Sequence, residues 1–113
     1  MGRSVAIAVS AALLSLNSAM VHALPRPQLN QRQTILEANR YLIADGWRPA
    51  PQQTPSPQER AIASVSLASL SACSGSGVGF CRYDYVREQQ TLSVVTVPSD
   101  PGKPSVGRVE RWW

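Results

Sequence analysis

Apolar residues recur three and four positions apart over residues 31–44, which is the spacing of an amphipathic helix. We expect a helix over this range, with Asn30 as its N-cap. The following Asp45-Gly46 pair supplies a stop, with glycine in the position that commonly ends a helix in a left-handed conformation. The Trp47 indole is then expected to fold back onto the apolar stripe as a core residue.

A second helix is predicted after Ser56-Pro57-Gln58-Glu59, which combines a capping box with proline at the first helical position. We expect this helix to continue to about Leu67 and a short strand or turn to lead into Cys73. Between the two helices, residues 49–57 hold four prolines. That composition predicts an extended, solvated connector that is too short to separate two folding units.

The spacing changes to a period of two after residue 80, which indicates strands. In residues 80–87, Cys81, Tyr83 and Tyr85 alternate with more polar positions. Residues 91–97 are rich in β-branched side chains and form the second strand of a predicted hairpin, and residues 105–113 offer a last strand. The predicted fold class is therefore α+β, with two N-terminal helices packed on one face of an antiparallel sheet of about three strands.

Residues 1–23 have the three parts of a secretory signal. Arg3 is followed by an uncharged apolar stretch over residues 5–16, which is too short to span a membrane. Val21 and Ala23 place small residues before a predicted cleavage after Ala23. We expect export by the general secretory route, no stable membrane insertion after cleavage, and one small domain over residues 24–113.

The chain has two cysteines, Cys73 and Cys81, on either side of a glycine-serine loop. After export they can pair with each other or with another chain. Their spacing differs from the Cys-x-x-Cys of thiol-disulfide oxidoreductases, which favours a structural bond. An intrachain bond stabilises the fold by about 2.5 kcal/mol in the chain-entropy estimate. The loop lacks the Lys-Ser/Thr of a phosphate-binding loop, so a tight reversal is expected.

Several classes of chemistry are excluded by composition. The single histidine, His22, lies in the predicted signal, so the mature chain has no Ser-His-Asp or Cys-His arrangement and no histidine-containing zinc site. The carboxylates fall in no motif. The net charge is +4, but the basic residues never form a run, which argues against a nucleic-acid partner. We expect no cofactor and no metal.

The segments Gly46-Trp47-Arg48-Pro49 and Cys73-x-Gly-x-Gly through Cys81-x-Tyr resemble those of small exported bacterial proteins. The similarity covers roughly residues 30–98. It implies a location in the cell envelope and a disulfide hairpin, and it supplies no activity, cofactor or catalytic residue.

The expected function is that of a small secreted or periplasmic binding module for an unknown protein or envelope component. The exposed edge of the sheet would offer it a surface for strand addition. The alternatives are a hydrolase inhibitor that presents the loop from Ser74 to Phe80 and, with less support, a small histidine-free enzyme. The candidate contact residues are two tyrosines and an arginine of the alternating strand, together with the tryptophan pair that ends the chain: Tyr83, Tyr85, Arg82, Trp112 and Trp113. The two tyrosines are either core residues or exposed. In the Trp112-Trp113 pair only one indole is expected to point inward.

Overall fold

The computed structural model describes residues 25–74 and 79–113. The predicted signal and the middle of the glycine-serine loop lie outside these residues. The elements follow in the order α2 (Ile35–Ala44), β1 (Arg48–Pro49), α3 (Pro57–Ala63), β2 (Leu70–Cys73), β3 (Cys81–Arg87), β4 (Gln90–Pro98) and β5 (Gly107–Trp112).

All five strands form one antiparallel sheet, so the prediction of about three strands is wrong. The strand order is β1-β3-β4-β5, and β2 also pairs with β3. Both extra strands use the same edge of β3, where β1 pairs with Tyr85 and Val86 and β2 pairs with residues 81–83. The predicted proline-rich connector therefore begins inside the sheet. Proline can occupy such an edge because no ladder hydrogen bond is required of its nitrogen there.

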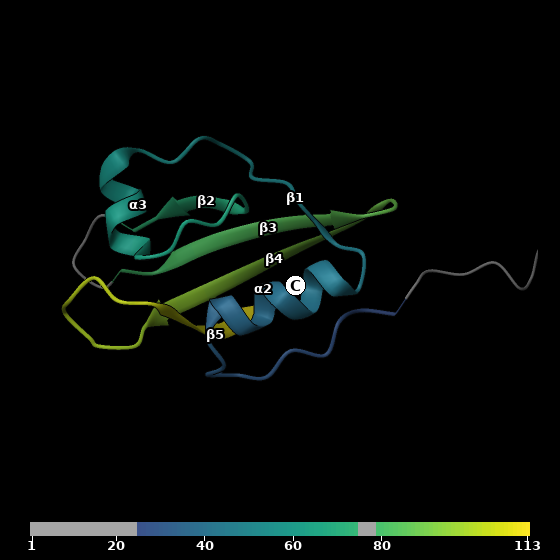
Figure 1. The fold of residues 1–113 in the computed structure, drawn as a ribbon, viewed down its shortest axis with the longest axis horizontal. Coiled ribbons are helices and arrows are strands. Elements are labelled where there is room, and N and C mark those ends of the chain that lie inside the picture. Colours follow the sequence, from purple (N-terminus) through teal and green to yellow (C-terminus); the bar gives the residue numbers. More distant parts are fainter. Residues whose placement is uncertain (1–24, 75–78) are drawn as a thin grey trace, which may run out of the picture.

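The two helices do not form the common layer that the sequence predicts. Helix α2 crosses one face of the sheet over β4 and β5, whereas α3 lies beside β2 (Figure 1). The second helix is also shorter than expected, because Ser64 adopts a left-handed conformation with φ of 62° and ends it after seven residues. The expected packing of both N-terminal helices on a three-stranded sheet is therefore wrong.

Helix α2 begins later than predicted. Its N-cap is Thr34, not Asn30, and Thr34 forms a capping box with Glu37. An isolated bridge between Thr34 and Arg108 holds Thr34 against β5 in an extended conformation. The extended backbone that this bridge requires is also the conformation of an N-cap residue, so tertiary pairing sets where the helix starts.

The end of α2 agrees with the prediction. Gly46 has φ of 90° and its N–H donates to the carbonyl of Ile43, while the Trp47 N–H donates to the carbonyl of Leu42. These two bonds make a Schellman motif. The motif turns the chain so that the Trp47 indole is fully buried in the core, as expected.

The core lies between α2 and the face of the sheet that it covers. The apolar stripe of the helix meets alternate residues of β3, β4 and β5, and Ala63 and Leu70 extend this core toward α3. The Tyr85 hydroxyl donates to Asn39 Oδ1 on α2 at 2.8 Å, which satisfies a polar group at the helix–sheet interface.

Glu59 connects α3 to the outer edge of β2. One carboxylate oxygen accepts from the Ser56 N–H at 2.8 Å in the predicted capping box, and the other accepts from the Cys73 N–H at 2.9 Å. The hydrogen bonds from Ser56 and Cys73 lower the pKa of Glu59. Glu37 forms the equivalent capping box on α2, and no strand N–H among the described residues donates to its carboxylate.

We predict that Glu59→Gln lowers the urea midpoint of unfolding at pH 7 more than Glu37→Gln, because glutamine has one acceptor oxygen for two N–H donors. Because the pKa of Glu59 is lower in the folded protein than in the unfolded chain, its carboxylate stabilises the fold at pH values above the ordinary pKa of 4.5. This stabilisation is lost as the pH falls through the pKa of Glu59 in the folded protein. The gap between the native and Glu59→Gln midpoints should therefore narrow below about pH 4. Equal effects of the two substitutions at pH 7 would show that the hydrogen bond from the Cys73 N–H to Glu59 adds no stability to that of the capping box.

Candidate interaction surface on the open face of the sheet

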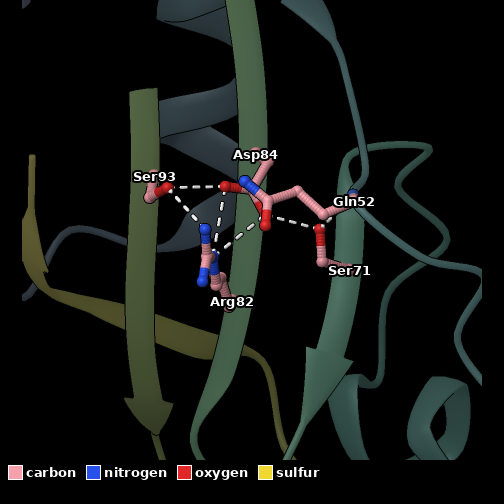
Figure 2. A network of polar contacts seen from close by, with 5 residues as sticks. All are labelled: Gln52, Ser71, Arg82, Asp84 and Ser93. Carbon is pink, nitrogen blue, oxygen red and sulfur yellow. Dashed lines mark hydrogen bonds and ion pairs between the residues drawn. The ribbon is translucent and has the colours of Figure 1, made fainter. Parts of the chain in front are cut away.

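The sheet has a second face, turned away from α2, which we call the outer face. The residues of β3 that alternate with the buried tyrosines, Arg82, Asp84 and Val86, point to it, as the period of two predicts. Figure 2 shows Arg82 and Asp84 on the side of the sheet opposite the helix. This face carries the arrangement that bears most directly on function.

Strand register arranges the outer face in rows. Arg82 pairs with Val95, and Val95 pairs with Arg111, so one row crosses three strands. In the next row Asp84 pairs with Ser93. Ser93 in turn exchanges both backbone hydrogen bonds with Trp113, at 2.8 and 3.0 Å. Directly opposed residues of antiparallel strands share a face, so the two rows place two arginines and an indole together.

Asp84 lies at the centre of this face and is 3% exposed. Its carboxylate accepts from the hydroxyls of Ser71 and Ser93, at 2.5 and 2.6 Å, and from Arg82 Nε at 3.1 and 3.2 Å (Figure 2). The Ser71 hydroxyl also accepts from the Gln52 N–H at 2.9 Å. A buried carboxylate is tolerated when it is paired and fully hydrogen-bonded, which is the case here.

This network fixes the Arg82 side chain on the surface. Besides the Asp84 contacts, Arg82 Nη2 donates to the Ser93 hydroxyl at 3.2 Å. The Arg82 side chain is nevertheless 38% exposed. Its guanidinium carbon lies 5.8 Å from the centre of the Trp113 ring, and that of Arg111 lies 5.2 Å from the same ring. Both distances allow a cation–π interaction.

The outer face is positively charged. Besides Arg82 and Arg111, the register places Arg48 opposite Val86 on this side. Within residues 25–74 and 79–113, no carboxylate lies within ion-pair distance of Arg48 or Arg111. The Asp84 charge is already engaged by Arg82, so an anionic group of a ligand would meet uncompensated positive charge here.

A shallow hollow of about 370 Å³ opens on the same face, next to the first row. Ala72, Phe80 and Val95 give it an apolar lining, and Arg82 and Arg111 lie at its border. Phe80 is exposed, as is Trp113, whose exposed fraction is 51%. Large exposed aromatic side chains beside arginine are characteristic of the residues that contribute most to protein interfaces.

The candidate contact residues separate into two groups. Tyr83 and Tyr85 are buried in the core, which agrees with the core alternative for these two residues. Burial raises the pKa of both hydroxyls, that of Tyr85 to about 12. Trp112 packs partly against the core, whereas Trp113 is exposed, as expected for a pair with one inward indole. Arg82 and Trp113 thus remain as surface candidates.

Sequence reasoning did not bring Arg111, Phe80 and Asp84 together with Arg82 in one site. The register of β4 with β5 shifts between Val95 and Thr96, so simple alternation along the last strand does not show which residues share a face with Arg82. Asp84 did have a signal, because it is a carboxylate in the middle of a strand with apolar neighbours on both sides. Such a residue needs hydrogen-bond donors wherever its strand is covered.

Cys73 and Cys81 form the expected intrachain disulfide. They are directly opposed in the pairing of β2 with β3, and the Ser74 N–H donates to the Phe80 carbonyl at 2.6 Å just beyond them. The bond therefore fastens β2 to β3 at the end of the sheet that carries Phe80 and the hollow.

Within the described ranges, no group of three or more histidine, cysteine or carboxylate side chains is placed to hold a metal ion. Across the same residues, no helix is long and apolar enough to cross a membrane. The chain matches no family model, no curated protein and no solved structure.

We predict that Asp84→Asn lowers the free energy of unfolding by about 2–3 kcal/mol, because the new amide group faces hydroxyl donors and leaves Arg82 without its counter-charge. Urea titration followed by tryptophan fluorescence measures this loss. Asp100→Asn is the matched control, since Asp100 and its partner Lys103 are exposed and 3.9 Å apart, and it should change stability by less than about 0.5 kcal/mol. A loss at Asp84 no larger than this would show that the network does not stabilise the sheet.

Proposed function

We propose that the protein is an exported, disulfide-stabilised binding module that contacts its partner through the outer face of the sheet. The observation that carries this proposal is the exposed cluster of Arg82, Arg111, Trp113 and Phe80 on the face of the sheet turned away from α2. Aromatic and arginine side chains lose little conformational freedom when they are already held in place. Here the Arg82 side chain is held by Asp84, and the backbone of Trp113 is held by its hydrogen bonds to Ser93.

The sheet edges are less suited to this role than the sequence suggested. At the outer edge of β5, the Arg32 N–H donates to the Val109 carbonyl and the Val109 N–H donates to the Gln33 carbonyl. At the outer edge of β2, the Cys73 N–H is capped by Glu59. Strand addition needs free backbone groups, and these positions have none to offer. The face therefore supports binding better than the edge does.

Export is part of the proposal. The disulfide supports it, because such bonds persist in oxidising compartments and are rare in the cytosol. The signal-like pattern of residues 1–23 supports it independently. The mass of the protein recovered outside the cytoplasm should lack these residues and two cysteine hydrogens.

The inhibitor hypothesis retains one supporting observation. The disulfide and the Ser74–Phe80 backbone bond brace the base of the loop from Ser74 to Phe80, as an inhibitor loop requires. Residues 75–78, which would have to enter a hydrolase, lie outside the described residues. A histidine-free enzyme has no comparable support, and we propose a non-catalytic role.

Site-specific photo-crosslinking in the producing cell tests the proposed surface. A photoreactive residue is placed at position 113 on the outer face or at position 41 on α2, where Tyr41 is also exposed. We predict a crosslinked partner from position 113 and none from position 41, detected as a shifted band with antibody to the protein. Crosslinking from position 41 alone, or from neither position, would contradict the proposal.

A further inference from the structure

We propose that the outer face binds an acidic protein segment in which carboxylates flank an apolar side chain. This inference rests on the proposed function and specifies the ligand of that surface. Two features point to it. Arg82 and Arg111 keep guanidinium groups at the surface, and Arg111 has no carboxylate partner among the described residues, while an apolar hollow lies beside both.

Arg111 offers a ligand a positive charge at the surface. Its guanidinium is exposed, lies over the Trp113 ring and has no carboxylate within ion-pair distance among the described residues. Arg82 keeps part of its guanidinium at the surface while Asp84 and Ser93 hold the rest. Arginine forms paired hydrogen bonds with carboxylates, and a guanidinium oriented in advance loses less entropy when it does so.

The spacing of the two arginines suits an extended segment. Arg82 and Arg111 lie on β3 and β5, with Val95 of β4 between them. Their backbones are therefore about 10 Å apart, twice the distance between neighbouring strands. A polypeptide laid across the strands can place one carboxylate at each arginine and still have an intervening residue above Val95.

The hollow decides between an acidic protein and an acidic polysaccharide. Its lining of Ala72, Phe80 and Val95 is apolar, and about 370 Å³ can receive one large apolar side chain. Removal of part of such a side chain from water favours binding. A uronate polymer supplies carboxylates but no apolar side chain, so it would leave the hollow and the exposed Phe80 unused. A polypeptide satisfies both features.

Selection of random peptides displayed on phage against the intact disulfide-bonded protein tests this inference. We expect the selected peptides to combine Asp or Glu with Leu, Phe, Ile or Met. Affinities of the synthetic peptides are then measured by fluorescence anisotropy. Arg111→Gln and Trp113→Ala should each weaken binding roughly tenfold, the effect of losing about 1.4 kcal/mol. Arg40→Gln on α2 is the matched control and should leave affinity unchanged.

Three results would overturn the inference. The first is a selection that yields no peptides or peptides without acidic residues. The second is equal loss of affinity in Arg40→Gln and Arg111→Gln. The third is tighter binding of polygalacturonate oligosaccharides than of any selected peptide, with the same dependence on Arg111. If a partner crosslinks from position 113 and any of these three results is also obtained, the outer face remains the binding surface but its ligand is not an acidic protein segment. The proposed function and this inference can therefore be tested independently of each other.

Discussion

The structure depends on one buried carboxylate. Asp84 joins three strands, because Ser71 of β2 and Ser93 of β4 donate to it and it pairs with Arg82 of its own strand β3. Through Ser71 it also holds Gln52 of the proline-rich segment. A short sheet in a small domain has a limited apolar core, so additional constraints matter. Here the constraint is polar and lies on the side of the sheet that α2 leaves open.

The same carboxylate links stability to the proposed binding surface. It neutralises one arginine and fixes its orientation, so that Arg82 and Arg111 both contact the Trp113 ring. The hollow and the exposed Phe80 adjoin this group, and the disulfide fastens the strands at that end. The core face and the outer face thus have separate roles. The first holds the tyrosines and Trp47 beneath α2, and the second presents arginine and aromatic side chains to solvent.

Local signals in the sequence predicted the local structure well. The Ser56–Glu59 capping box, the stop at Gly46, the return of Trp47 to the core and the alternation of β3 depend on a few neighbouring residues, and all are present. What failed depends on distant partners. Thr34 replaces Asn30 as the cap because Thr34 pairs with Arg108 of β5. Likewise, β1 forms by pairing with Tyr85 and Val86 of β3, which are distant in the sequence from Arg48 and Pro49.

The candidate site shows the same division. Arg82 and Trp113 were found because they flank conspicuous aromatic residues, but Arg111 joins them only through the shifted register of β4 and β5. The tyrosines were ambiguous because alternation defines two faces without showing which one a helix covers. That choice is made by the packing of α2, which no local pattern specifies.

The central claim is that Asp84 orients Arg82 within an otherwise exposed cationic face. Nuclear magnetic resonance of the arginine Nε–H groups tests it directly through their rates of hydrogen exchange with water. The account predicts slow exchange at Arg82, fast exchange at Arg111, and an increase at Arg82 alone in Asp84→Asn. Equally fast exchange at Arg82 and Arg111 in the native protein would contradict it.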